Sequence, residues 1–118
     1  MLRIRTFLVA AALGALVLTA SSGAVVPKLS GAVGPGFTIT LKRGALAVKR
    51  LKPGRYTITV SDKSSIHNFH LKGPGLNREI TTVGFVGTKT ITVTLKKGRY
   101  TFVCDPHSTS MKGSFTVA

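Results

Sequence analysis

Residues 100–117 read YTFVCDPHSTSMKGSFTV, two alternating segments joined by a loop that carries a thiol, an imidazole and a thioether. Alternation of apolar and polar side chains is typical of half-buried β-strands. In the first segment Phe102 and Cys104 share one face, so Cys104 points inward if Phe102 lies in the core. The pattern predicts two adjacent strands, with Cys104, His107 and Met111 held together on the loop between them.

The same alternation recurs through the chain after residue 36 and is divided by turns rich in glycine and proline. We predict strands at residues 37–41, 56–60, 91–95, 100–104 and 114–117. Many short strands with no amphipathic helix favour an all-β antiparallel sandwich over residues 37–118. Residues 25–36 contain three glycines and two prolines and are predicted to form a flexible lead-in.

One short sequence occurs twice. Residues 51–57 (LKPGRYT) and 95–101 (LKKGRYT) both place a glycine turn before a strand that opens with arginine and tyrosine. Either Tyr56 or Tyr100 is a candidate to hydrogen-bond back across a corner of the sandwich, as tyrosine corners do. Simple packing of the two rings at strand edges is the alternative.

The first 24 residues have the layout of a secretory signal peptide. Arg3 and Arg5 precede an apolar run at residues 7–18, and small residues at 22–24 suit cleavage after Ala24. The apolar run is short for a bilayer-spanning helix, which needs roughly 20 residues. We expect an exported protein, periplasmic or secreted, with no transmembrane span after cleavage; an uncleaved anchor is the alternative.

The chain is strongly basic. Its 17 Lys and Arg residues less Arg3 and Arg5 leave 15 against three acidic residues, so residues 25–118 carry about +12. Such a charge attracts an acidic redox partner or an anionic surface. The basic residues are scattered along the sequence, which disfavours nucleic-acid binding. The domain is expected to act as a monomer.

Cys104, His107 and Met111 lie within eight residues of one another. Each alone has a more ordinary interpretation, as a buried inert thiol, a solvated loop histidine or a core methionine. Together they match three ligands of a trigonal copper site, which takes two His, one Cys and a long axial Met. Cys104 is the only cysteine of the chain, so it cannot form an intramolecular disulfide. We therefore predict a metal site at this loop.

The second imidazole must come from residues 66–71, which hold both remaining histidines. Strand parity places His67 on the face that also carries two apolar side chains of this stretch, and His70 on the other. His67 is therefore expected to face inward as the ligand, and His70 remains the alternative metal ligand. Asn68 is expected to hydrogen-bond to the backbone of the Cys104 loop and to hold the two segments together.

These residues carry a resemblance to a known family. The chain contains the pair His67-Asn68 and, later, the motif Cys104-x-Pro106-His107-x-x-x-Met111-x-Gly113-x-Phe115-x-Val117. In both features it resembles the cupredoxins, the plastocyanin/azurin family of small blue copper proteins. The resemblance covers roughly residues 37–118 and implies a Greek-key β-sandwich that holds one type 1 copper. It also implies that His67, Cys104 and His107 are equatorial ligands and that Met111 is the weak axial one. Plastocyanins are usually acidic where they meet partners, so a photosynthetic role is not supported for this basic chain.

The expected function is one-electron transfer by an exported blue copper protein that is not an enzyme. Copper storage or delivery with the same ligands is the alternative. A cysteine-based enzyme would leave Met111 unexplained, and a multicopper oxidase needs more histidines than the three present. Zinc is the chemical rival, because Cys and His also bind zinc.

Overall fold

The computed structural model describes residue 14 and residues 25–118. Apart from Gly14, the predicted signal peptide at residues 1–24 therefore lies outside the described residues. In the described part of the chain, no helix has the length and hydrophobicity that crossing a membrane takes.

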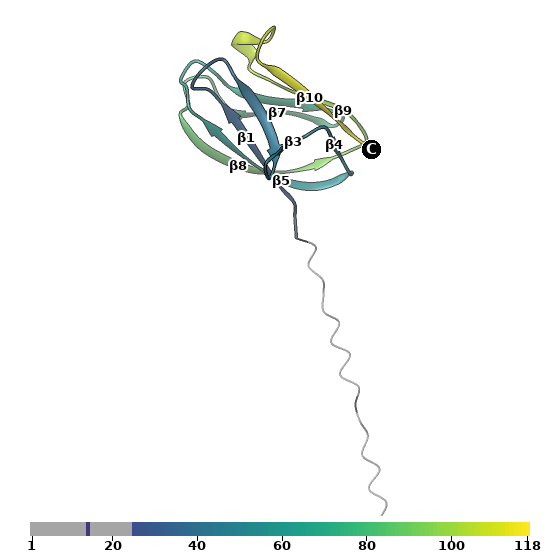
Figure 1. Cartoon of the computed structure of the whole chain (residues 1–118). Helices are drawn as coiled ribbons and strands as arrows, with labels where there is room; N and C mark the ends of the chain where they lie inside the picture. Colours follow the sequence, from purple (N-terminus) through teal and green to yellow (C-terminus); the bar gives the residue numbers. More distant parts are fainter. Residues whose placement is uncertain (1–13, 15–24) are drawn as a thin grey trace, which may run out of the picture.

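Within residues 25–118 the chain forms ten strands and one short 3₁₀ helix, η1 (Asp105–His107). The strands are β1 (Lys28–Val33), β2 (Ile39–Arg43), β3 (Leu46–Ala47), β4 (Arg50–Leu51), β5 (Gly54–Asp62), β6 (Phe69–Gly73), β7 (Leu76–Thr81), β8 (Gly87–Leu95), β9 (Gly98–Val103) and β10 (Lys112–Val117). They make two five-stranded sheets, with the orders β3-β2-β1-β5-β8 and β4-β10-β9-β6-β7. Figure 1 shows the two sheets packed as layers.

Alternation along the strands builds the core between the layers. In β5 every second side chain is buried from Tyr56 to Asp62, and β9 buries Tyr100 and Phe102 in the same way. Side chains of successive residues point to opposite faces of a strand, so this alternation gives each sheet one apolar face. The all-β prediction is confirmed.

The prediction that the sandwich is wholly antiparallel is wrong. β1 runs parallel to β5, with Lys28 opposite Thr57, and β4 runs parallel to β10. Parallel neighbours must be joined by a long crossover, and here the intervening strands supply it. Both sheets are therefore mixed.

The prediction of a flexible lead-in over residues 25–36 is wrong for the part that forms β1. Leu29 and Val33 are fully buried, so this strand belongs to the core. Between them, a Cβ atom built on Gly31 would lie only 3.0 Å from the side chains of Phe69 and Val60. Glycine at this position lets the two sheets approach closely.

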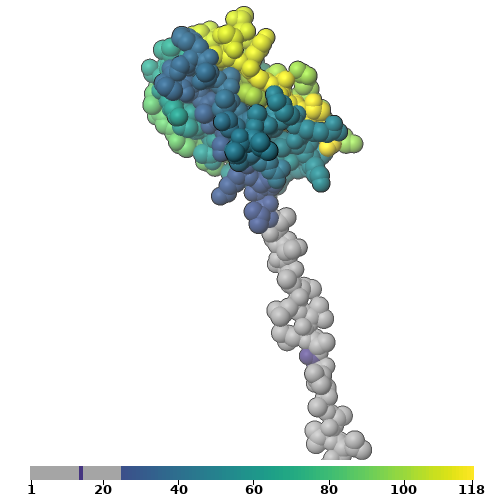
Figure 2. Space-filling model, viewed as in Figure 1, coloured from purple at the N-terminus to yellow at the C-terminus, as the bar shows by residue number. Residues whose placement is uncertain are grey.

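The two ends of the sandwich differ in what they hold. One end, the turn end, comprises residues 25–27 and the turns at 52–54, 73–75 and 96–98. The other, the loop end, comprises residues 34–37, 63–68 and 104–111. In Figures 1 and 2 the chain enters the domain at the lower, turn end, and the yellow loop that follows β9 stands at the upper, loop end.

Both repeated tyrosines lie at the turn end, and of the two alternatives left open by the sequence, hydrogen bonding across a corner is the one observed. The Tyr56 hydroxyl donates to the carbonyl of Lys52 at 2.6 Å. The Tyr100 hydroxyl donates to the carbonyl of Pro74 at 2.8 Å and accepts from the amide of Lys96 at 3.0 Å. These bonds fix the turns at 52–54, 73–75 and 96–98 to strands β5 and β9, which carry the two tyrosines.

Candidate metal centre

Cys104 follows the last residue of β9 and is fully buried, with Phe102 on the same face. The loop after it folds back on itself. The His107 amide donates to the Cys104 carbonyl at 3.0 Å, and the Cys104 amide donates to the Met111 carbonyl at 3.0 Å. Pro106 is the second residue of η1, in the first turn, where proline is tolerated. The backbone therefore holds the imidazole of His107 over the thiol, with Nδ1 and Sγ 3.6 Å apart.

His67 reaches the same place from the loop between β5 and β6. Its ring is fully buried, and its Nε2 lies 3.1 Å from the Gly36 carbonyl oxygen. A carbonyl only accepts hydrogen bonds, so Nε2 carries the proton and the neutral ring has its lone pair at Nδ1. That Nδ1 lies 3.6 Å from Cys104 Sγ and 3.2 Å from His107 Nδ1.

The three donor atoms form a triangle of the size that a metal ion requires. Sides of 3.2, 3.6 and 3.6 Å enclose a point about 2.0 Å from all three atoms, close to the 2.0–2.3 Å of metal–nitrogen and metal–sulfur bonds. One thiolate and two imidazoles are the donor set of a trigonal copper site. His67, Cys104 and His107 thus fit one type 1 copper ion.

Met111 lies at the base of the same loop. It is 1% exposed, and its amide donates to the His107 carbonyl at 2.8 Å. These backbone hydrogen bonds hold Met111 next to His107 and Cys104, and the Met111 side chain is buried in the core. Its role as an axial ligand remains a prediction from the sequence.

Asn68 ties the two metal-binding segments together as predicted. Its Oδ1 accepts from the backbone amide of Asp105 at 2.7 Å, and its Nδ2 donates to a carboxylate oxygen of Asp105 at 2.7 Å. Asn68 is 1% exposed, whereas the Asp105 side chain is 40% exposed, so the double contact is buried on the Asn68 side only. Asn68 and Asp105, 37 positions apart in the sequence, are thus held together, and each directly follows a proposed ligand, His67 or Cys104.

His70 lies outside this group. Its Nδ1 faces Asp105 Oδ2 at 2.8 Å and its Nε2 faces Asn77 Oδ1 at 2.5 Å, so both ring nitrogens are engaged away from Cys104. The geometry therefore favours His67 over His70, although His67 precedes β6 and does not belong to the strand that the parity argument assumed. His70 instead contacts the carboxylate of Asp105, the residue after Cys104.

Asp105 is the hub of these contacts, a role that the sequence reasoning missed. Partial burial acts to raise the pKa of Asp105, but hydrogen bonds from Asn68 and His70 and the nearby charges of His70 and Lys72 outweigh it. The pKa of Asp105 is lowered from its ordinary value. The carboxylate is therefore held ionised at the root of the loop.

Phe37 is the second residue that sequence reasoning misplaced. It was predicted to begin a strand, but β2 begins at Ile39 and Phe37 is 64% exposed. Its ring lies edge-on against both imidazoles, with centroids 5.4 Å from His67 and 5.0 Å from His107. Phe37 covers the metal-binding group from the solvent side.

The chain is similar to known proteins in both sequence and fold. Residues 45–118 match the family described as copper binding proteins, plastocyanin/azurin family. A comparison with curated protein sequences finds no match.

Solved structures with the same fold include copper proteins. Rusticyanin is 20% identical with a TM-score of 0.57, and the alignment covers 77% of this chain and 76% of that one. Rusticyanin from Thiobacillus ferrooxidans gives 23% identity and a TM-score of 0.54 over the same shares. A chain of a heme-copper terminal oxidase dimer gives 18% identity and a TM-score of 0.54, covering 77% of this chain and 63% of that one. At these identities the likeness is one of fold.

Proposed function

Because the chain belongs to the plastocyanin/azurin family of copper-binding proteins, we propose that it carries single electrons through one copper bound by His67, Cys104 and His107. The observation that carries this proposal is the triangle of three donor atoms at the loop end, whose two deepest members are fully buried. We extend the ligand set to Met111 as the weak axial ligand, in line with its burial beneath the same loop.

The copper, when bound, supplies the one-electron change between Cu(I) and Cu(II). The chain's own residues hold the ligands still. The His67 ring is fixed through Gly36, and the Cys104 loop is fixed through its own backbone and through Asn68. Ligands that do not move when the charge changes keep the reorganisation that accompanies electron transfer small, and the buried setting tunes the potential.

His107 is the proposed point at which electrons enter and leave. It is only partly buried, whereas His67 and Cys104 are fully buried. Exposed apolar side chains lie at the same end of the sandwich, at Phe37, Ile66, Val83 and Val86. A partner that docks on them approaches the exposed imidazole edge without having to strip water from charged groups.

Basic side chains at the loop end suit an acidic partner. Lys63 and Lys89 are exposed, one just before the His67 loop and the other near the start of β8. Cations at the margin of an apolar contact accelerate encounter with an acidic protein more than they tighten the complex.

We further propose that the protein works outside the cytoplasm and is not an enzyme. The basic and apolar sequence of residues 1–24 supports export. The four proposed ligands are all used to hold and tune the copper, and the chain has no second group of histidines for a catalytic metal cluster.

The direct test is spectroscopic. Purified protein loaded with Cu(II) should show the intense visible absorption of a copper–thiolate bond and the electron-spin spectrum of a type 1 site. Cys104→Ser should lose both, while its far-ultraviolet spectrum stays that of a β-protein. Retention of the visible band in Cys104→Ser would reject Cys104 as a ligand and with it the proposed site.

A second measurement separates electron transfer from copper storage or delivery, which would use the same ligands. The copper-loaded protein should undergo repeated reduction and reoxidation without losing metal. It should also release copper slowly to a chelator in competition. Rapid metal release at every redox cycle would favour delivery instead.

A further inference from the structure

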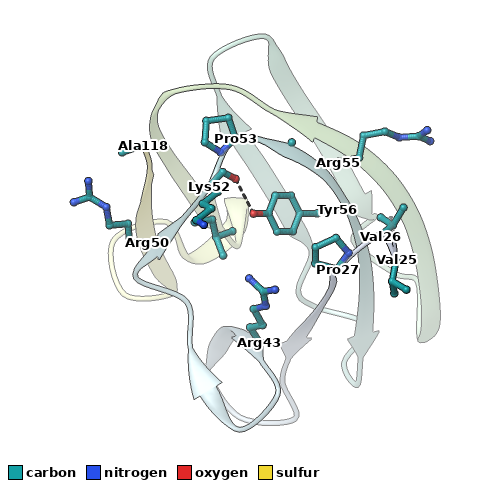
Figure 3. A pocket seen from close by; sticks show the side chains of 12 residues that line it. Val25, Val26, Pro27, Arg43, Arg50, Lys52, Pro53, Arg55, Tyr56 and Ala118 are labelled. Carbon is teal, nitrogen blue, oxygen red and sulfur yellow. Dashed lines mark hydrogen bonds between the residues drawn. The ribbon is translucent and has the colours of Figure 1, made fainter. Parts of the chain in front are cut away.

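A groove lies at the turn end of the sandwich, on the far side of the domain from the metal centre. Its volume is about 890 Å³. It is lined by the entering chain, by β4 and by the start of β5; the cationic lining residues are Arg43, Arg50, Lys52 and Arg55. Figure 3 shows the Arg43 guanidinium directed into the groove, with Arg50 and Arg55 pointing outward on opposite sides.

None of these four cations takes part in an ion pair of the described residues, although Ala118 also lines the groove. Within residues 25–118 both ion pairs involve Asp105, which lies at the loop end. The cations are spread around the turn end, with Arg43 directed inward and Arg50 and Arg55 outward, so this end as a whole presents positive charge that the ion pairs of the fold do not use. Cations spread over one end of a domain attract an anionic surface, and the attraction is weakened by salt.

Apolar side chains adjoin the cations at the rim. Val25 is 88% exposed, and Val26 and Pro27 line the groove beside it. Amphipathic helices that rest on the headgroup region of a lipid bilayer combine apolar and basic side chains, and this non-helical rim combines the same two kinds of side chain.

The segment that precedes this rim in the sequence also favours contact with a membrane. Residues 7–18, which are apolar, connect to the domain through Val25. If the segment is retained, it brings the rim to a membrane. If it is cleaved after Ala24, the new α-amino group at Val25 adds a positive charge to the groove.

We propose that the turn end, through Arg43, Arg50, Lys52 and Arg55, binds the surface of an anionic phospholipid membrane. The cations contact lipid phosphates, and Val25 lies at the level of the headgroups. Because the loop end is at the opposite pole of the sandwich, a domain bound in this way turns His107 and its apolar surroundings toward solvent. The two surfaces then serve different partners at the same time.

The test compares charge reversal at the two ends of the molecule. The full chain, loaded with copper, is mixed with vesicles of phosphatidylcholine alone or with added phosphatidylglycerol, and the bound fraction is measured by sedimentation. Arg50→Glu with Arg55→Glu removes charge from the groove. Lys63→Glu with Lys89→Glu changes the net charge by the same amount at the loop end and is the matched control.

We expect the full chain to prefer the anionic vesicles and the groove variant to lose this preference by about tenfold or more, because each basic residue at a membrane surface adds to binding. The loop-end variant should retain most of the preference. Both variants should keep the visible copper band, which shows that the domain is intact.

Three outcomes would overturn the proposal. Equal losses in the two variants would mean that net charge alone drives the binding. Equal binding of the unaltered chain to neutral and anionic vesicles would assign the binding to the apolar segment. Release of the protein by millimolar inorganic phosphate at constant ionic strength would identify a small-anion site in place of a membrane surface.

Discussion

The two ends of the sandwich treat buried polar groups in opposite ways. At the turn end the hydroxyls of Tyr56 and Tyr100 are paired with backbone groups of the turns beside them. At the loop end His67, Cys104 and His107 bury two imidazole nitrogens and a thiol that face one another. The turn-end arrangement completes the hydrogen bonding of the fold. The loop-end arrangement directs three potential metal-ligating atoms, two nitrogens and one sulfur, at a common point.

This contrast indicates that the turn end contributes to the stability of the fold and that the loop end carries the metal site. A buried polar group costs free energy unless it has partners, and at the loop end the Nδ1 atoms of His67 and His107 and the Cys104 thiol have one another. A copper ion bound there would replace these contacts with bonds to the metal. The turn end and the core must therefore provide enough stability for the strands to hold the three donors in place. Changes at the two ends should accordingly affect different measurements.

The largest effect is expected for His67→Ala. It removes one of the three donors, so the copper-loaded variant should lose the intense visible band. His70→Ala is the control, since His70 bonds Asp105 and Asn77 and does not face Cys104. Absorption titrations with Cu(II) would compare the two variants. Loss of the band in His70→Ala alone would show that the strand register around Phe69 is off by one.

A large effect on stability alone is expected at the turn end for Gly73→Ala. A Cβ atom there would lie 2.2 Å from the ring of Tyr100, which must move. Forcing extra atoms into a packed core costs about 1–3 kcal/mol. Chemical denaturation of the apo-protein would measure the loss, and the copper band should persist. Gly36→Ala, where a Cβ atom meets nothing within 4 Å, should be close to neutral.

An intermediate effect is expected at the loop end for Asn68→Ala. It removes both contacts with Asp105, and groups that orient metal ligands in this way typically contribute ~10–100-fold to metal affinity. Competition with a chelator of known affinity would measure the change. Unaltered affinity, with only a loss of stability, would show that Asn68 holds the fold and does not position the ligand.

The sequence predicts best what is encoded locally. The alternation at residues 56–60, 91–95 and 114–117 marks strands β5, β8 and β10, because period-2 burial is visible in a window of a few residues. Strand β1 was missed because Gly31 and the glycines and prolines on either side of the strand resemble a loop. The strand is formed by parallel pairing with β5, some 30 residues away, which no local window shows.

The same distinction holds for the site. The spacing of Cys104, His107 and Met111 on one loop is local. Parity preferred His67 as the buried histidine, but its premise of a strand over residues 66–71 does not hold, because β6 begins at Phe69 and Asn68 is buried as well. Asp105 and Phe37 were not recognised because their contacts join distant segments. Only the paired segments together show that Asp105 bonds Asn68, or that Phe37 rests on two imidazoles.

A smaller effect is expected for the two tyrosine corners. Tyr100→Phe removes one hydrogen bond to Pro74 and one from Lys96, whereas Tyr56→Phe removes a single bond to Lys52. A typical intramolecular hydrogen bond contributes ~0.5–1.5 kcal/mol. Denaturation midpoints should fall more for Tyr100→Phe than for Tyr56→Phe, with the copper band unchanged in both. The reverse order would mean that the repeated turns do not stabilise the domain through these bonds.

The smallest effect is expected in the pH dependence of stability, through Asp105. The pKa of this carboxyl is lowered in the folded protein, because the bonds from Asn68 and His70 and the charges of His70 and Lys72 outweigh its desolvation. A lowered folded pKa means that the contribution to stability is present above the ordinary pKa of an aspartate and is lost as the pH falls through the folded value. The side chain is 40% exposed, so solvent screening limits the contribution to roughly 0.2–1 kcal/mol.

Asp105→Asn should therefore lower the free energy of unfolding of the apo-protein slightly at neutral pH. It should also make the loss of stability on acidification shallower. Glu79→Gln is the matched control, since it removes a carboxylate that forms no ion pair within residues 25–118. Denaturation series from neutral pH to about pH 3 would resolve the difference, because that interval spans the titration of an aspartate. Parallel curves for Asp105→Asn and the unaltered protein would mean that Asp105 holds the loop only as a hydrogen-bond acceptor and that its charge adds no stability.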